Sequence, residues 1–441
     1  MTVWHDEGKQ ILDILVAQGL EGEVFCSGFE REPIRFEDNE LKMMESSTRT
    51  GFGVRVVEDG RVGFAAATGP GNGRALVEKA RNVARFGSEV EYEFPEPRDY
   101  PEVDTFDPAI EDLSADEMLD CGSRMVESVR AYEPAAQVKA SVSRSVGTAR
   151  LLNTRGLDLV QSATGHGVGL QATLVGDDGL LHTGDHAGGH HLVTDVDPVV
   201  DSVLWQMEAA SRVARIEDGV YPVVFAPTGL GDILRPLLAC ADGDSVHRGI
   251  SPWRDRIGER LLDPRFTLVD DGLLPEGSGA TPWDDEGIPS QTTPIIREGI
   301  LENYLLDLKS SARLGMKPTG NGFRGGSGSL PGIAASNLVV AAGDTPVEEI
   351  IGSMEDGLLV LSLMGAWGAN PFAGRVSGNV NLGFRIVDGE IVGRVKDCMI
   401  YLSVFEALED GLLSISSERE LRHSTLFPHV LLDGVSVSTG G

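Results

Sequence analysis

The chain has 441 residues, of which 41% are hydrophobic and 24% are charged, a composition typical of a soluble globular protein with two or three domains. Its 37 lysines and arginines face 68 aspartates and glutamates, giving a net charge of −31. Because no basic run concentrates the positive residues, we expect no direct binding to nucleic acid. No apolar stretch approaches the roughly 18 residues of a transmembrane helix, and the start, MTVWHDEGKQ, lacks signal-peptide features, so we expect a cytoplasmic protein without membrane association.

The first half of the chain predicts helices alternating with antiparallel strands. Apolar residues recur at helical spacing within residues 7–20. Asp59-Gly60 separates two strand-like runs, and because this pair tolerates positive φ angles we expect a tight hairpin there. Further elements are expected as a strand at 33–46, helices near 72–86 and 115–131, short strands within 137–182 that break at 153–156 and 176–179, and a helix within 195–216.

Four histidines gather in one glycine-containing segment, LHTGDHAGGHHLVTD, which begins at Leu181. The glycines make a helix improbable there, so we expect a loop. Such a loop could wrap a metal ion with two histidines and a carboxylate; a plain polar loop or adventitious metal is the alternative. The candidate ligands are His182, Asp185, His186 and His190. We interpret His166, in ATGHGVG, as a turn residue.

Asp218-Gly219 marks the expected boundary between two halves, 1–216 and 217–441. In the second half we expect a strand at 223–225 and a helix at 229–240, despite Pro236 in its interior. Acid-Gly turns at 298–299 and 388–389 predict strand pairs at 293–297 with 300–306 and at 380–387 with 390–396. The fold class is therefore α+β, with mixed or antiparallel sheets, packed helices and a strand-rich C-terminal half.

Three further features could carry function. Asp284-Asp285-Glu286 could form a paired-carboxylate acid/base site, but bonding of an Asp to backbone amides is the expectation we prefer. The glycine-rich loop at 320–328 lacks the Lys-Ser/Thr of a phosphate-binding P-loop. Glycines permit close backbone approach, so this loop could line a peptide cleft or a subunit contact, or be a plain turn. Asn321, Arg324 and Asn370 are the candidate cleft or interface residues.

The cysteines, Cys26, Cys121, Cys240 and Cys398, lie far apart without a C-x-x-C pair, which predicts free thiols in a reducing compartment.

Four stretches spread over nearly the whole chain carry a family resemblance. They are FEDNELKMMESSTRTGFGVRVVEDGRVGFAAAT (36–68), LLNTRGLDL (151–159), TPWDDEGIPSQTTPIIREGILENYLLDLKSSARLGMKPTGNGFRG (281–325) and NPFAGRVSGNVNLGFRIVDGEIVGRVKD (370–397). Their D-D-E-G-x-P, P-T-G-N-G-x-R and N-P-x-x-G elements resemble those of the TldD/PmbA family, also labelled modulators of DNA gyrase. One departure is Arg375, where many members carry Asp before a Phe-Ser pair.

The resemblance also shows what is missing. In the catalytic branch of the family an H-E-x-x-x-H helix binds zinc in the region that matches YPVVFAPTGLGDILRPLLACADGDSVHRGIS (221–251). Counting back from Gly243-Asp244 places the two histidine positions on Leu234 and Ala239 and the glutamate position on Arg235. Leu and Ala offer no lone pair to a metal, and Arg is no base. The chain thus resembles the PmbA (TldE) branch, which lacks the zinc motif.

This resemblance implies a non-catalytic subunit of a TldD/TldE-type zinc metallopeptidase that acts on unfolded or leader peptides. It implies no cofactor in this chain, zinc in a TldD-like partner, and a heterodimer or a homodimer. Two alternatives stay open: a self-sufficient peptidase using metal at the His182–His191 cluster, and a homodimeric peptide-binding or scaffold protein.

Overall fold

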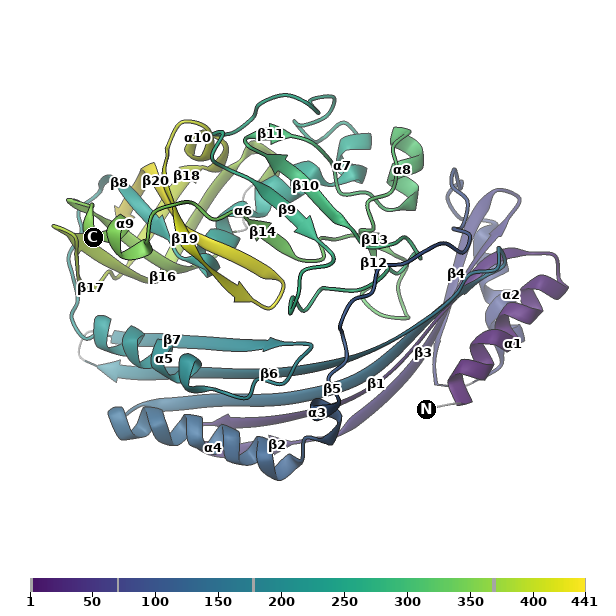
Figure 1. Cartoon of the computed structure of the whole chain (residues 1–441), viewed down its shortest axis with the longest axis horizontal. Helices are drawn as coiled ribbons and strands as arrows, with labels where there is room; N and C mark the ends of the chain where they lie inside the picture. Colours follow the sequence, from purple (N-terminus) through teal and green to yellow (C-terminus); the bar gives the residue numbers. More distant parts are fainter. Residues whose placement is uncertain (1–2, 70, 177–178, 367–369, 441) are drawn as a thin grey trace.

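The computed structural model describes residues 3–69, 71–176, 179–366 and 370–440, which form two stacked layers of sheet with helices packed on them (Figure 1). The lower layer is a seven-stranded antiparallel sheet built from residues 21–189, and the upper layer is an eleven-stranded mixed sheet built from residues 219–439. This arrangement confirms the α+β class. Among the described residues, no helix is both long and apolar enough to cross a membrane.

The lower sheet consists of unusually long, paired strands in the order β4-β3-β1-β5-β6-β7, with β2 beside β1. Asp59 and Gly60 adopt φ angles of 51° and 71°, which confirms the predicted tight hairpin between β3 and β4. The expected single strand at 33–46 is wrong: the chain turns at Asp38-Asn39, both with positive φ, so this segment holds the end of β1 and all of β2. The strands are β1 Glu21–Glu37, β2 Glu40–Met44, β3 Ser47–Glu58, β4 Arg61–Thr68, β5 Gln137–Asn153, β6 Asp158–Gly176 and β7 Gly179–Gly189.

One face of this sheet is apolar and carries the helices. On β5, Val138, Ala140 and Val142 alternate with exposed residues and pack against the buried face of α4, including Met125 and Val129. Because side chains alternate along a strand, the opposite face of the same strands is polar and turns toward the upper layer. The helices of this half are α1 Val3–Ala17, α2 Gly73–Ala84, α3 Pro108–Asp112, α4 Ala115–Tyr132 and α5 Asp197–Ala209.

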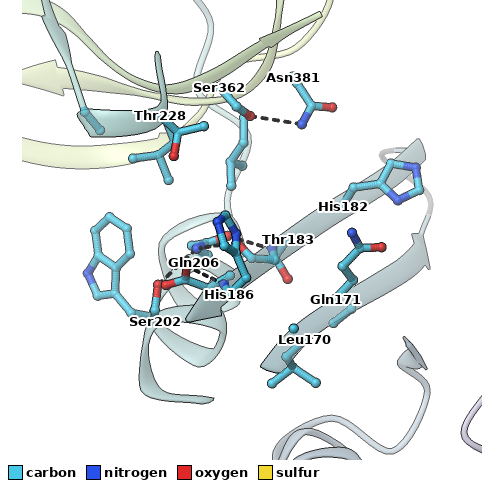
Figure 2. A pocket seen from close by; sticks show the side chains of 18 of the residues that line it. Leu170, Gln171, His182, Thr183, His186, Ser202, Gln206, Thr228, Ser362 and Asn381 are labelled. Carbon is cyan, nitrogen blue, oxygen red and sulfur yellow. Dashed lines mark hydrogen bonds between the residues drawn. The ribbon is translucent and has the colours of Figure 1, made fainter. Parts of the chain in front are cut away.

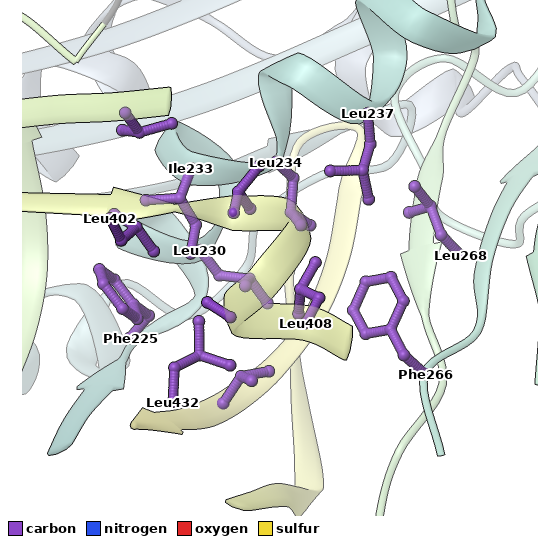
Figure 3. Close-up of a cluster of buried hydrophobic side chains, with 14 of the residues drawn as sticks. Phe225, Leu230, Ile233, Leu234, Leu237, Phe266, Leu268, Leu402, Leu408 and Leu432 are labelled. Atoms are coloured by element: carbon purple, nitrogen blue, oxygen red, sulfur yellow. The ribbon is translucent and has the colours of Figure 1, made fainter. Parts of the chain in front are cut away.

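The upper sheet runs in the order β11-β10-β9-β14-β20-β18-β16-β15-β8. Its main core lies between the sheet and α6, where Phe225 of β8, Leu402 of β18 and Leu432 of β20 surround the helix (Figure 3). The strands are β8 Gly219–Phe225, β9 Leu268–Asp271, β10 Thr292–Arg297, β11 Ile300–Leu301, β14 Leu338–Val340, β15 Asp356–Met364, β16 Arg375–Val387, β17 Glu390–Arg394, β18 Cys398–Ser403, β19 Leu412–Arg422 and β20 Thr425–Thr439.

The two strand pairs predicted in this half form at their predicted turns, with β10–β11 at Glu298-Gly299 and β16–β17 at Asp388-Gly389. The first pair is shorter than expected, because β11 ends at Leu301 and the chain then leaves the sheet. The remaining elements are α6 Pro227–Ala241, α7 Gly243–His247, α8 Leu308–Leu314, α9 Val347–Gly352, α10 Val404–Glu409, the 3-10 helix η1 Pro371–Ala373, and the small pair β12 Gly322–Phe323 with β13 Gly332–Ile333.

Candidate functional site: a cleft between the two halves

Helix α6, at the zinc-motif position, does not offer a metal site. Leu234 is 1% exposed and lies in the hydrophobic core beside Leu230 and Leu237, whereas Arg235 is exposed and Ala239 is half-buried (Figure 3). Leucine and alanine carry no ligand atom and arginine is no base, so the side chains at the three motif positions do not fit a hydrolytic zinc ion.

The histidine-rich segment is also not arranged as the metal-binding alternative requires. As far as Gly189 it forms strand β7 rather than a loop, and it pairs residue by residue with residues 166–176 of β6. His182 and His186 are four residues apart on that strand, about 13 Å, which is too far for two ligands of one ion. Within the described parts of the chain, no group of three or more His, Cys, Asp or Glu side chains could hold a metal.

Each member of that segment has another contact instead. The Nδ1 of His182 lies 3.0 Å from the hydroxyl of Thr173, and the Nδ1 of His190 lies 2.9 Å from the carbonyl of Thr164. Asp185 forms an ion pair with Arg422. His166 is not a turn residue as expected: it lies within β6, is 6% exposed, and accepts a hydrogen bond from the backbone of Val193. Burial lowers the pKa of His166 to about 4.

A cleft of about 910 Å³ lies between the two layers. Such a volume lies within the range of small-ligand or peptide sites. Its floor is the polar face of the lower sheet, where Gln171 and His182 lie, and Thr228 and Ser362 of the upper half lie across from them (Figure 2). Its wall is completed by α5 and α9 and by the β19–β20 hairpin, through Ser202, Trp205, Gln206, Val347, Ile351, Glu420, Arg422 and His429.

The β19–β20 hairpin bridges the two halves at one end of the cleft. Arg422 of β19 pairs with Asp185 of β7 and with Glu420, and the ring of His423 stacks on that of His186 with centroids 4.5 Å apart. Burial lowers the pKa of both rings, and it lowers that of Arg422 as well. Burial also raises the pKa of Glu420 and lowers that of His429 to about 4. This wall is therefore a partly desolvated cluster of titratable groups.

The edge of the lower sheet is closed inside the cleft by a side chain. The amide of Gln206, 6% exposed on α5, accepts a hydrogen bond from the backbone N–H of Gly184 at 3.0 Å and donates one to its carbonyl at 3.1 Å. Neighbouring antiparallel strands exchange the same pair of hydrogen bonds. Gln206 thus occupies the position of one residue of an eighth strand beside β7 (Figure 2).

A buried charge network joins the halves on the other side of the cleft. Arg55 of β3, 3% exposed, donates to Glu23 at 2.7 Å and to Glu286 at 2.8 Å. Arg324 donates to Glu23 and lies over the ring of Phe25, its guanidinium 5.0 Å from the ring centroid. Burial alone would lower the pKa of Arg55, but Glu23, Tyr92 and Glu286 more than offset this, so it lies above the ordinary value.

The acid run 284–286 belongs to this network. Asp284 accepts hydrogen bonds from the backbone N–H groups of Glu286, Ile288 and Gly322, as the preferred sequence interpretation expected. Burial raises the pKa of all three carboxyls, that of Asp285 to about 6. The arrangement holds the 284–286 turn, the 322–324 segment and the lower sheet together.

None of the three residues predicted to line a peptide cleft or an interface lines this cleft, and the predicted interface role stays a prediction. Asn321 is fully buried and donates to Asp270 at 2.6 Å, so it stabilises the interior of the upper half. Arg324 lies in the charge network at the contact between the halves. Asn370 is exposed and caps η1 by accepting a hydrogen bond from Phe372. Residues 367–369, next to Asn370, lie outside the described chain.

Sequence reasoning missed Gln206, Glu420, Arg422 and His429. No local motif identifies them, since each reaches the cleft only through the tertiary fold. The one available signal was the strict polar alternation of QVKASVSRS at 137–145, which predicts a sheet face that is not buried in a core.

Comparison with known proteins adds three consecutive family matches. The models describe PmbA/TldA metallopeptidase domain 1 at residues 22–84, the central domain at 108–216 and the C-terminal domain at 218–439. An uncharacterized protein of Methanocaldococcus jannaschii is 26% identical over 97% of this chain and 98% of its own length. The metalloprotease PmbA of Escherichia coli O157:H7 is 24% identical over 90% of this chain and 88% of its own.

Solved structures with the same fold cover nearly the entire chain. TldE from Thermococcus kodakarensis superposes with a TM-score of 0.89 at 23% identity, covering 98% of both chains. A candidate modulator of a DNA gyrase from Thermotoga maritima superposes with a TM-score of 0.90 at 22% identity, covering 99% of this chain and 100% of its own.

Proposed function

The chain belongs to the PmbA/TldD metallopeptidase family, and from this premise we propose that it is a TldE-like subunit without its own zinc site, which presents peptides to a zinc-bearing TldD-like partner. The observation that carries the proposal is helix α6. A hydrolytic zinc needs imidazole or carboxylate ligands with an open position for water, and a nearby base to accept the proton of that water. Leu234, Arg235 and Ala239 supply neither.

The cleft supports the peptide-binding part of the proposal. It combines a polar floor with a wall of apolar residues from β15 and α9, and its polar groups are hydroxyls, amides and imidazoles rather than a single strong ligand for one small molecule. Such a lining suits an extended chain that is held through its backbone with little selection for side chains. A cytoplasmic location is part of the same proposal, since all four cysteines are free thiols.

The test is reconstitution with a TldD-like protein that carries H-E-x-x-x-H. We expect the chain alone to hold no stoichiometric zinc and to leave an unfolded peptide intact. We expect the mixture to form a complex of defined mass by light scattering and to cleave the peptide. A partner whose zinc ligands are replaced is the control, and it should assemble without cleaving.

Two results would overturn the proposal. Tightly bound zinc together with hydrolysis by the isolated chain would make it a self-sufficient peptidase. A stable self-associated chain that neither joins nor activates any zinc-bearing relative would make it a scaffold.

A further inference from the structure

The face of the lower sheet that turns toward the upper half carries a stripe of basic side chains. Alternation along β1 puts Arg31 and Arg35 on this face, and the strand register puts Arg49 of β3 and Lys139 of β5 beside them. All four are exposed. None forms an ion pair or a side-chain hydrogen bond with another described residue. Arg35 and Lys139 line the cleft itself.

The four charges form two close pairs. Arg49 is the diagonal neighbour of Arg31, and Lys139 is the diagonal neighbour of Arg35, so in each pair the Cα atoms are about 7–8 Å apart. The two arginines of β1 are four residues apart, about 13 Å along the strand. Like charges at this spacing repel each other. The nearest carboxylate on the same face, that of Glu37, follows Arg35 by two residues and forms no ion pair with the four described basic side chains. Two unneutralised pairs at this spacing fit an extended polyanion better than a single small anion.

The stripe contrasts with the rest of the molecule. The chain has a net charge of −31, and most of its buried or half-buried arginines are held by carboxylates, as Arg55, Arg144 and Arg422 are. On this face of β1, β3, β5, β6 and β7 the acidic side chains lie only near the ends, where Glu21 and the network-bound Glu23 begin β1 and Glu37 ends it. Around the basic stripe the face consists mainly of Ser, Gly, Gln and Thr, with Phe29 and Pro33 of β1 beside the arginines and His182 and His186 on β7.

We propose that the basic stripe Arg31–Arg49–Arg35–Lys139 selects acidic extended peptides and guides them into the cleft. This inference rests on the proposed function, and names the class of peptide. The favoured ligand chemistry is carboxylate, from glutamate and aspartate side chains or from a free C-terminus. A nucleic acid fits less well, because its phosphates are closely spaced and four basic side chains cannot neutralise them in a protein with a strongly negative net charge.

Binding by the isolated chain tests the proposal. Labelled unfolded peptides of equal length are compared by fluorescence anisotropy: Glu-rich with a free C-terminus, Glu-rich with an amidated C-terminus, Gln-rich and Lys-rich. We expect both Glu-rich peptides to bind about tenfold more tightly than the Gln-rich one at low salt. We expect this difference in affinity to shrink near 0.5 M salt, where the Debye length is only about 4 Å and exposed charges are strongly screened. If amidation alone abolishes the preference, the C-terminal carboxylate is the ligand.

The variants are Arg35→Glu with Lys139→Glu, and as a matched control Arg74→Glu with Lys79→Glu, two exposed bases on α2 that undergo the same charge change away from the cleft. We expect the stripe variant to lose the preference and the control to keep it. Unchanged thermal unfolding of both verifies that they fold.

Three results would overturn the inference. The first is equal binding of Glu-rich and Gln-rich peptides; the second is tight binding of oligothymidylate in their place. The third is a change in the mass of the peptide-free chain in the stripe variant, which would make the stripe a contact between copies. Failure of this inference can be told apart from failure of the proposed function. If the chain activates a zinc-bearing partner but shows no preference for acidic peptides, the proposed function stands and the role of the basic stripe is disproved.

Discussion

Arg55 shows how single residues hold the two halves together. It lies on β3 of the lower sheet, yet one of its carboxylate partners, Glu286, belongs to the upper half. Its other partner, Glu23, is shared with Arg324, so Glu23 and Glu286 each face a guanidinium. Buried charges of this kind contribute little net stability as a set, but each depends on the others because an unpaired charge in the interior is costly.

Removing Arg55 should therefore destabilise the protein more than its two ion pairs suggest. We expect Arg55→Met to lower the free energy of unfolding by about 3–5 kcal/mol, because Glu23 and Glu286 lose a buried counter-charge. Denaturant unfolding followed by circular dichroism measures the difference. The control is Arg61→Met, whose pair with Glu89 is exposed and should contribute less than about 1 kcal/mol. Equal effects of the two substitutions would contradict a special role for the network.

Helix α6 shows that replacing side chains at the H-E-x-x-x-H positions would not by itself restore a zinc site. Its buried face includes Leu230, Ile233, Leu234 and Leu237. Its more exposed face carries Arg235 and Ala239, which are four residues, or about one turn, apart. The register inferred from the family resemblance placed a histidine on Leu234, and in this helix that position points into the core.

Two double-histidine variants of α6 test whether zinc binding depends on the direction in which the two histidines point. In Arg235→His with Ala239→His, two imidazoles one turn apart on the more exposed face should bind zinc measurably by metal analysis and calorimetry. In Leu234→His with Ala239→His, we expect no such binding and a loss of roughly 2–5 kcal/mol of stability, because a polar ring replaces a core leucine. Tighter zinc binding by the second pair would show that the helix rotates or unwinds to accept the metal.

Local turn chemistry made the hairpins predictable, and long-range pairing made the site unpredictable. Asp59, Glu298 and Asp388, each followed by glycine, all adopt the positive φ that the pattern indicated. Asp38 and Asn39 also adopt positive φ, but no glycine follows the aspartate, so the acid-Gly pattern did not identify this turn. The histidine-rich segment was interpreted as a loop because its glycines make a helix improbable, but up to Gly189 it pairs as a strand with residues 166–176 of β6.

The cleft could not be found in this way. Gln206 is 22 residues from Gly184, and Arg422 is 237 residues from Asp185, and no residue type at those positions is unusual on its own. The predicted boundary near 216–217 stays a prediction.

At the scale of the whole molecule, each half contains a histidine, buried His166 and half-buried His429, whose neutral form the fold favours. Burial lowers the pKa of His166 in the lower sheet and of His429 in the upper sheet to about 4. An unfolded histidine has a pKa of about 6.5, so the stability these two provide is present above that pH and is lost as the pH falls toward 4. Asp270 and Asp285 act in the opposite sense, because burial raises their pKa to about 6 and the fold then favours their protonated form.

The variant His166→Gln isolates the contribution of His166 to the pH dependence of the free energy of unfolding. Between pH 6.5 and 4 we expect the free energy of unfolding of the original chain to fall relative to the variant by at most about 3 kcal/mol, since glutamine does not titrate. Thermal or denaturant unfolding across this pH range measures both curves. Parallel curves would show that His166 is protonated equally in the folded and unfolded chain.

The position of β20 determines when the upper half can form during synthesis. This strand pairs with β8, β14, β18 and β19, so it lies at the centre of a sheet whose first strand, β8, leaves the ribosome nearly half a chain earlier. The lower sheet has all its strands by Gly189 and can fold while translation continues. The apolar face of α6 cannot be fully covered until β20 has been synthesised. Between the synthesis of α6 and that of β20 we expect this exposed face to bind chaperones.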